Sequence, residues 1–293
     1  MCWLCDAKSA LNDSSTPAST HRWSSRRGFL LASGAAAAST LLPAEAEAQV
    51  QVGSPSGMRR LVPAQQLEGA ASQQYRQMME QARRQGALAP DDHPQVVRLR
   101  RIARVLIPLA PPWNPRARDW QWEVNLIGSS QINAFCMPGG KIAFYTGILD
   151  KLELNDDEVA MIMGHEMAHA LREHARAQLA KTQATSIGLS FGAQLLGLGD
   201  LGNMAANLGT QLLSLKYSRD DETDADLVGL ELAARGGFHP QASVTLWEKM
   251  TAQGGGSGLS FLSTHPSGPN RIRELQANVP KVMGLYEQAR RRG

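Results

Sequence analysis

Residues 161–174 read MIMGHEMAHALREH, and the motif HEMAH inside this stretch decides the fold. Apolar residues flank the motif at helical spacing, which predicts one helix over residues 155–182. Because residues four apart share a face of a helix, His165 and His169 can present both imidazoles to one metal ion. Glu166 points about 100° around the helix from His165, where a general base for hydrolysis must lie.

The first turn of this predicted helix has the residues that helix starts favour. Asn155 can cap it, and Glu158 follows three residues later, as in a capping box. His174 lies nine residues after His165, which on a continuous helix is about 180° away. We therefore expect His174 to face away from the motif. Two histidines with ordinary hydrogen-bond partners remain the plain alternative until a third ligand is found.

A catalytic zinc site uses three protein ligands and a water, so HEMAH needs one more ligand. The stretch YSRDDETDAD, residues 217–226, opens a second predicted helix that runs from near Ser218 to Ala234. Glu222 and Asp226 are four apart and share one face of it. Glu222 would be the third ligand, and Asp226 would accept the free ring N–H of a ligand histidine. Alone, the stretch fits a solvated helix start equally well; beside HEMAH, the ligand interpretation is favoured.

Three motifs, taken in order, resemble those of one enzyme family. HEMAH, then SRDDETDAD at 218–226, then THPSGPNRI at 264–272 look like the HEXXH zinc metallopeptidases, or gluzincins, that include the CAAX prenyl endopeptidases and their soluble periplasmic relatives. The resemblance covers about residues 95–280. It implies an α+β fold, a mostly helical zincin-like metallopeptidase domain with a small antiparallel sheet beside the HEXXH helix.

The same resemblance implies a role for each site residue. His165, His169 and Glu222 would bind one Zn²⁺ per chain, Glu166 would be catalytic, and Asp226 would orient a ligand. The zinc would polarise the scissile carbonyl of a peptide bond and lower the pKa of its water toward ~7. The implied activity is that of a zinc metalloendopeptidase, a hydrolase.

His265 and Arg271 are six residues apart in the motif THPSGPNR, and the resemblance places both near the zinc. A cationic donor there could stabilise the oxyanion of a tetrahedral intermediate. Alternatively, His265 could swing in on the glycine-rich stretch 254–263, become a fourth ligand and leave the site latent. A turn residue before Pro266 is the plain alternative for His265.

The stretch NAFCMPGGKIAFYTGIL, residues 133–149, predicts a β-hairpin that turns at Pro138-Gly139-Gly140. It resembles the edge-strand segment of the same family. A substrate would add to that edge as an extra strand, and its backbone would form hydrogen bonds near Asn133 and Ala134. The alternative is a hairpin of the core with no contact to substrate.

The N-terminal stretch is typical of protein export. The sequence SRRGFL at 25–30 precedes a short apolar run, after which small residues alternate with glutamate. We predict a twin-arginine export signal peptide over residues 1–48, a linker over 49–63 and the metallopeptidase domain over 64–293, so we expect the protein in the periplasm. A generic export signal or an uncleaved anchor is the alternative. Cys136 alone would follow the signal, so no internal disulfide is expected.

Composition limits the partners. The 293 residues carry a net charge of only +3, which gives no reason to expect nucleic acid. The apolar segment 184–215 breaks into two arms of roughly 14 residues, fewer than the ~20 that cross a membrane. We expect a helical pair packed on the domain; the other interpretation is an amphipathic lip that contacts a membrane peripherally or guides substrate.

The sequence therefore predicts a zinc-dependent endopeptidase that acts on protein or peptide substrates in the periplasm, with envelope protein quality control as its setting. A proteolytically silent chaperone or assembly factor that keeps the zinc fold and relies on segment 184–215 is the alternative. A purely structural metal domain is a third interpretation. It would need four protein ligands, and His265 is the one residue that stands out as a fourth.

Overall fold

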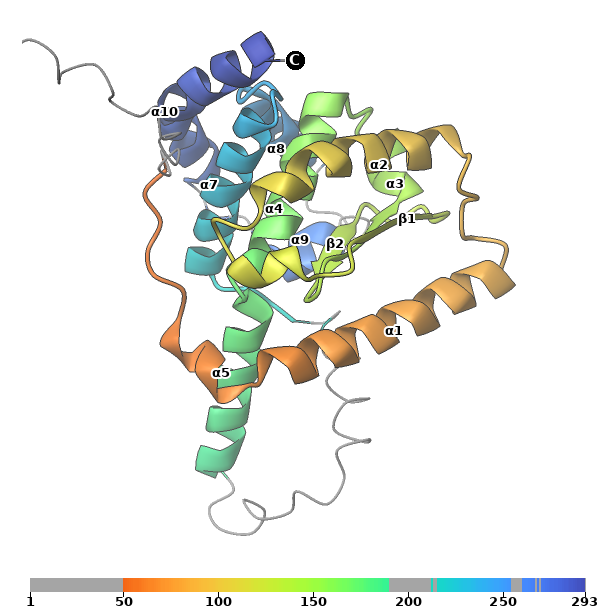
Figure 1. Ribbon diagram of the computed structural model, residues 1–293, viewed down its shortest axis with the longest axis vertical. Helices are drawn as coiled ribbons and strands as arrows, with labels where there is room; N and C mark the ends of the chain where they lie inside the picture. Colours follow the sequence, from red (N-terminus) through yellow and green to blue (C-terminus); the bar gives the residue numbers. More distant parts are fainter. Residues whose placement is uncertain are drawn as a thin grey trace, which may run out of the picture. The chain divides into compact units, whose positions relative to one another are not determined.

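The computed structural model describes residues 50–189, 212, 215–253, 260–266, 268 and 270–292 (Figure 1). Along the chain the elements are the 3-10 helix η1 (Gly57–Leu61), α1 (Ala64–Arg84), α2 (Pro94–Leu106), the 3-10 helices η2 (Ile107–Leu109) and η3 (Pro115–Arg118), β1 (Glu123–Ile127), β2 (Ala134–Met137), β3 (Lys141–Tyr145), α3 (Thr146–Lys151), α4 (Asp156–Leu171), α5 (His174–Leu189), α7 (Arg219–Arg235), α8 (Ala242–Ala252), α9 (Ser260–Thr264) and α10 (Arg271–Arg292). Helices dominate and one small sheet accompanies them, so the predicted α+β class is confirmed.

The sheet has the strand order β1-β3-β2 and is mixed. β2 and β3 form the predicted antiparallel hairpin, and Gly139 and Gly140 at its turn have φ values of 86° and 77° that favour glycine. The sheet departs from the expected antiparallel arrangement in one pairing, because β1 pairs with β3 in parallel, from Glu123 opposite Lys141 onward. This pairing leaves β2 at the edge of the sheet.

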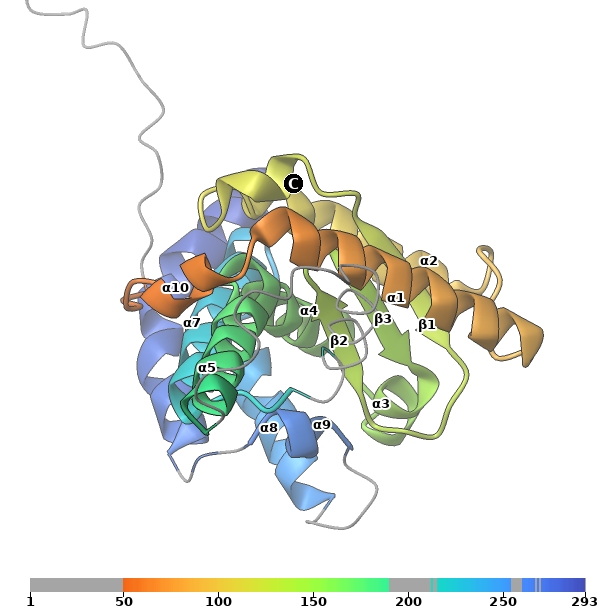
Figure 2. The same cartoon turned by 90° about the horizontal axis from the view of Figure 1, so that it is seen from below.

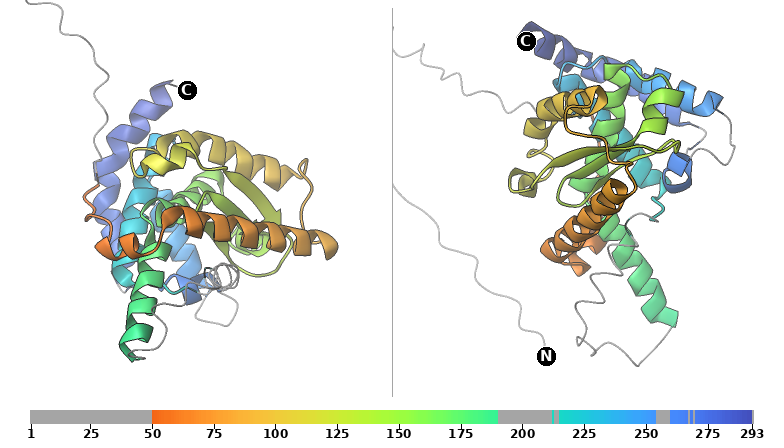
Figure 3. Two further views of the ribbon diagram at one scale, coloured as in Figure 1. Left: turned by 60° about the horizontal axis from the view of Figure 1, so that its bottom comes forward. Right: turned by 90° about the vertical axis from the view of Figure 1, so that its right-hand side faces the viewer.

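Alternating side chains bury both faces of the sheet. Ile142 and Phe144 pack with α2 and α4 in one core, whereas Ala143 and Tyr145 pack with α1 in a second core. Figure 3 shows α1 on one side of the sheet and α2 and α4 on the other. Tyr75 of α1 belongs to this second core and also joins α1 to the backbone of β3, because its hydroxyl donates to the carbonyl of Ile142 at 2.5 Å.

Helix α4 lies at the centre of the fold, and every residue from Glu158 to Leu171 in it is buried. It begins with the predicted capping box, in which Asn155 accepts from the Glu158 backbone N–H at 2.9 Å. α7 packs along α4 (Figures 1 and 2). At the crossing a Cβ atom on Gly229 would lie 2.6 Å from the His165 nitrogen, so only glycine allows this approach.

The helix predicted over residues 155–182 is instead two helices, and this part of the prediction was wrong. α4 ends at Leu171 and α5 starts at His174, with Glu173 between them at a φ of 59°. Ion pairs with Arg59 and Arg176 hold the Glu173 carboxylate. The break turns His174 back toward α4, so the expectation that His174 faces away was also wrong.

Residues 50–63, most of the predicted linker, pack against the helices and are named here the N-terminal strap. Val50 is buried, and its backbone N–H donates to the Glu231 carboxylate of α7 at 2.9 Å. The Gly53 carbonyl accepts from the Arg172 guanidinium. The described residues all belong to one compact unit, within residues 48–293.

Two predicted segments fall largely outside the described residues. The glycine-rich stretch 254–263 is described only from Ser260, where α9 begins, so its last residues are helical. Segment 184–215 is described only at 184–189, 212 and 215. Among the helices that can be described, none combines the length and apolar character needed to cross a membrane.

Candidate metal centre and substrate cavity

Four side chains from three parts of the fold meet at one point. His165 and His169 come from α4, Glu222 from the first turn of α7, and His265 directly follows α9. One potential ligand atom from each lies within 4.8 Å of the others, and all four residues are buried. The Nε2 atoms of His165 and His169 are 3.2 Å apart, and Glu222 Oε1 is 3.3 Å from His169 Nε2. This is the spacing of donors that share one ion.

The hydrogen-bond partners of these histidines suit a cation. Asp226 Oδ1 lies 2.9 Å from Nδ1 of His165, so a proton on Nδ1 is accepted there and the Nε2 lone pair faces the cluster. Burial lowers the pKa of His169 well below its usual value, which favours the neutral, ligating form. If the Nε2 lone pairs of both histidines face the cluster, a positive charge must lie between them. The donor set of imidazoles and a carboxylate fits a divalent zinc-like ion.

Glu222 is ionised in this arrangement. Burial raises its pKa, but the interactions with the His169 and His265 imidazoles outweigh burial and hold the pKa well below its usual value. Its second oxygen, Oε2, accepts from Arg271 Nη1 at 2.9 Å. A buried carboxylate that stays negative beside neutral imidazoles is what a dication requires of its anionic ligand.

Glu166 lies beside the cluster and is not one of its four residues. Its Oε1 atom is buried and finds no hydrogen-bond donor among the residues that the structure describes, the nearest charged partner being His265 Nε2 at 3.5 Å. Burial raises the pKa of Glu166, although His265 and His165 partly offset this shift. A buried carboxylate with one free oxygen and a raised pKa can both take up and release a proton, as a general base must.

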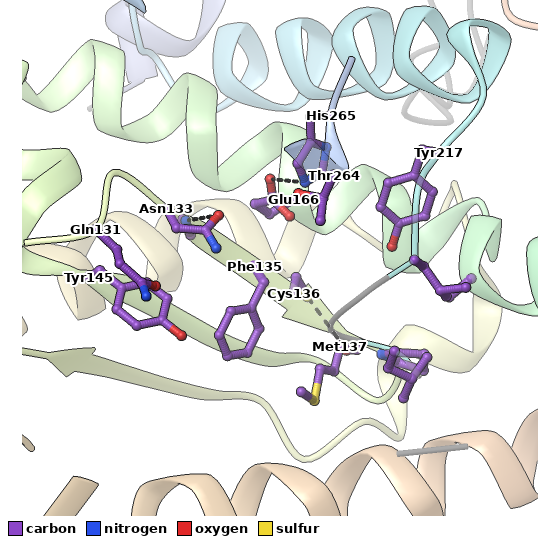
Figure 4. A pocket seen from close by; sticks show the side chains of 15 residues that line it. Gln131, Asn133, Phe135, Cys136, Met137, Tyr145, Glu166, Tyr217, Thr264 and His265 are labelled. Atoms are coloured by element: carbon purple, nitrogen blue, oxygen red, sulfur yellow. Dashed lines mark hydrogen bonds and ion pairs between the residues drawn. The ribbon is translucent and has the colours of Figure 1, made fainter. Parts of the chain in front are cut away.

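The carboxylate of Glu166 faces a cavity of about 210 Å³, shown in Figure 4. One wall is the edge of the sheet, formed by Asn133 and strand β2 from Ala134 onward. Its lining comprises Gln131, Asn133, Ala134, Phe135, Cys136, Met137, Pro138, Tyr145, Glu166, Ala175, Leu212, Leu215, Tyr217, Thr264 and His265. Within the described chain β2 pairs with β3 alone, so its outer edge is open on the side of this cavity.

Arg271 lies behind the cluster and is not among the residues that line the cavity. Its guanidinium donates to Glu222 and, through Nη2 at 2.7 Å, to Asp226 Oδ1, while its Cζ sits 3.4 Å from the centre of the Trp247 ring. The predicted contact with a reaction oxyanion does not fit this position. Arg271 instead holds two carboxylates in place. His265, in contrast, does reach the cluster, with Nδ1 3.1 Å from Glu222 Oε1.

Three residues near the cluster were not found from the sequence. Tyr217 stacks on the His169 ring with centroids 3.9 Å apart, and His174 and Asp224 form a hydrogen-bonded pair behind that ring. Tyr217 and His174 depend on a loop and a helix break that local patterns do not encode.

Comparisons with known proteins agree with this site. A family model described as peptidase family M48 matches residues 97–279, more than half of the chain. The mitochondrial metalloendopeptidase OMA1 of Schizosaccharomyces pombe is 35% identical over 198 residues, 67% of this chain and 56% of that protein. The metalloprotease YcaL of Escherichia coli is 28% identical over 52% of this chain and 59% of its own length.

A further relative is named for its role in assembly. The β-barrel assembly-enhancing protease of Escherichia coli is 27% identical over 56% of this chain, which covers 36% of that protein. The chain therefore spans between 36% and 59% of the length of these three relatives. The predicted resemblance to HEXXH metallopeptidases is confirmed at the level of the family.

Proposed function

This chain belongs to peptidase family M48, and from that premise we propose that it is a zinc-dependent metalloendopeptidase that cleaves protein or peptide substrates. One observation carries the proposal. Four converging donor atoms lie next to a buried carboxylate, Glu166, whose free oxygen faces a cavity with an open strand edge. Ion, base and substrate groove are the three parts that metal-assisted amide hydrolysis needs.

We assign the residues as follows. His165, His169 and Glu222 hold the ion, and Asp226 fixes the orientation of His165. A zinc ion bound there would polarise the scissile carbonyl and acidify a water. Glu166 accepts a proton from that water and delivers it to the leaving nitrogen, a transfer that its raised pKa assists.

The substrate lies along β2 as an added strand. The outer edge of β2 forms a wall of the cavity that contains Glu166, and the substrate backbone would pair along it near Asn133 and Ala134. The Asn133 carbonyl itself accepts from the Tyr145 N–H, and the Asn133 side chain accepts from the Ala134 N–H. Backbone pairing of this kind reads an extended chain and not a particular sequence. The cavity volume of about 210 Å³ has room for the side chains nearest to the scissile bond.

His265 has one of two roles in this site. Its Nδ1 lies 3.3 Å from His165 Nε2, within the ligand cluster, which supports a fourth-ligand role that keeps the enzyme latent. Burial lowers the pKa of His265, but Glu166 and Glu222 outweigh burial and raise it, which supports a cationic donor for an oxyanion. The first role requires that His265 leaves the cluster before substrate is cut; the second requires that it stays.

The setting that we propose is the periplasm, where the enzyme would remove misfolded envelope proteins. The stretch SRRGFL and the apolar run after it support twin-arginine export, with residues 1–48 removed and 64–293 as the enzyme domain. The name of the β-barrel assembly-enhancing protease from Escherichia coli supports an envelope role. Replacing Arg26 and Arg27 together by lysine should retain the protein in the cytoplasm, as read by cell fractionation; export at the normal level would contradict twin-arginine transport.

The proposed activity is tested by metal analysis combined with a protease assay. The purified full chain should contain one zinc per molecule and cleave casein, lose the activity with a chelator, and regain it when zinc is added back. A protein free of bound metal would contradict the metal centre. A zinc-loaded protein that cuts no unfolded substrate would instead favour a silent chaperone or assembly factor.

A further inference from the structure

The two histidines of the HEMAH motif are supported in different ways behind the cluster. His165 donates its Nδ1–H directly to the carboxylate of Asp226, at 2.9 Å. Nδ1 of His169 lies instead 3.0 Å from Nδ1 of a third histidine, His174, which is 4% exposed. Where no metal ion is proposed between them, two imidazole nitrogens at this distance form a hydrogen bond, in which one must donate and the other must accept.

A carboxylate on the far side of His174 decides the direction. Nε2 of His174 is 3.0 Å from Asp224 Oδ2, and Asp221 Oδ1 lies 3.9 Å away. An anionic carboxylate only accepts, so Nε2 of His174 carries a proton. Asp224 is in turn held by Arg172 Nε at 2.6 Å, and the same guanidinium donates to the Gly53 carbonyl of the N-terminal strap.

We propose that His174 is a positioning residue for the metal site, which works together with Asp224. In this relay His169 donates its Nδ1–H to Nδ1 of His174, and His174 donates its Nε2–H to Asp224. The Nε2 lone pair of His169 then points to the cluster, in the tautomer that binds an ion. The inference rests on the proposed metal centre, since a tautomer matters only if Nε2 is a ligand.

The fold is arranged to place His174 there. On an unbroken helix, His174 would lie five residues beyond His169 and about 140° around the axis. The break between α4 and α5, with Glu173 at a φ of 59°, brings the ring back against His169, with centroids 5.0 Å apart. A non-glycine residue in this conformation is unfavourable and persists where its surroundings hold it.

Each ligand histidine therefore has its own aspartate and arginine. Asp226 and Arg271 serve His165, while Asp224 and Arg172 serve His169 through His174. Both aspartates stand in the sequence DAD of α7, and α7 is fixed against α4 at the Gly164–Gly229 contact. One helix thus orients both imidazoles from behind.

The test compares three histidine variants by their affinity for zinc. His174→Phe keeps a ring but accepts no proton, whereas His174→Asn offers a carbonyl oxygen close to the former Nδ1 position. His239→Phe is the matched control, because His239 packs on Tyr286 far along the chain from the motif. Zinc dissociation constants are measured on the full chain by competition with a chromophoric chelator, and apoprotein melting temperatures are recorded alongside.

We expect His174→Phe to weaken zinc binding by about 10- to 100-fold, the range seen when outer partners of ligand histidines are removed. His174→Asn should bind within about threefold of the unaltered chain, and His239→Phe should match it. Equal affinity of His174→Phe and the unaltered chain would overturn the relay, as would a His174→Asn variant as weak as His174→Phe. If the unaltered chain binds no zinc, the proposed metal centre itself fails.

A second measurement needs no variant and covers the case in which His174→Phe does not fold. The zinc-loaded full chain with ¹⁵N-labelled histidines should show scalar coupling across the hydrogen bond between the Nδ1 atoms of His169 and His174. His174 should carry its proton on Nε2 alone. Protons on both nitrogens of His174, or two uncoupled Nδ1 atoms in the zinc-loaded chain, would contradict the proposal.

Discussion

The two sides of the ligand cluster differ in what their polar atoms contact. On the cavity side, the Oε1 atom of Glu166 is buried without a hydrogen-bond donor in the described part of the chain. On the opposite side, Asp226, Arg271 and one oxygen of Asp224 form close hydrogen bonds to the ligands or to their neighbours, while Asp224 Oδ1 is buried without a partner among the described residues. The hydrogen bonds on the supporting side fix the geometry of the ligands, whereas on the cavity side one acceptor is left free for chemistry.

The largest expected effect lies on the cavity side. Glu166→Gln removes the general base and nearly conserves volume, so casein cleavage should fall by about 10²–10⁴-fold. The zinc content should not change, because Glu166 is not among the cluster ligands. Assays of the zinc-loaded variant measure both. Turnover at the normal rate would exclude Glu166 from the mechanism. Loss of zinc would mean that Glu166 also supports the metal site, so that the two sides are not separate in function.

The second prediction concerns the supporting side. Arg271→Met leaves the buried Glu222 and Asp226 carboxylates without their shared cation, which should lower the free energy of unfolding by about 3–5 kcal/mol. Chemical denaturation of the apoprotein measures it. Arg273→Met is the matched control, since Arg273 lies two residues further along the same helix, is exposed and contacts Asn270. An equal, small loss of stability in both variants would mean that Arg271 contributes no more to folding than an exposed arginine does.

The third prediction tests the contact that joins the two sides. Gly229→Ala places a methyl group 2.6 Å from the His165 nitrogen, so α7 must move away from α4, at about 1–3 kcal/mol of stability. Gly69→Ala in α1 is the control; no atom lies within 4 Å of its added Cβ, and it should stabilise the helix by about 0.5–1 kcal/mol. Denaturation curves that shift in the same direction for both variants would contradict the close contact.

The smallest effect is expected at His265, and its sign separates the two roles proposed for this residue. If His265 plugs the site in nine of ten molecules, His265→Ala should raise casein cleavage by about tenfold. Initial rates with saturating zinc measure it. An unchanged or lower rate would argue against the plug, and a loss of kcat with KM unaltered would assign His265 to the oxyanion.

Sequence reasoning reached the parts of the site that local spacing determines. The four-residue spacing of HEMAH and the distance from Glu222 to Asp226 both follow from helix geometry. The capping box at Asn155 and the turn at Gly139 likewise use only nearby residues. For these features the backbone conformation is decided within a few positions, so one sequence is enough.

The parts that were missed depend on distant segments. The parallel pairing of β1 with β3 depends on how the β2–β3 hairpin packs against β1. The residue pattern within a strand does not determine this direction. The end of α4 has neither glycine nor proline; Glu173 adopts its conformation because Arg59, from before α1, and Arg176 hold its carboxylate. The position of His174 follows from that break, and so its contact with His169 could not be predicted.

The free edge of β2 also bears on which chains the protein can admit. Its strand is four residues long, Ala134–Met137, and it lies in a recess of about 210 Å³. A neighbouring folded molecule presents no loose backbone that fits such a recess, so edge-to-edge aggregation is disfavoured. Under the proposed function, a chain that has lost its native structure would be the one that fits this recess. The protein would then distinguish folded from unfolded substrates by the accessibility of their backbone, and not by their side chains.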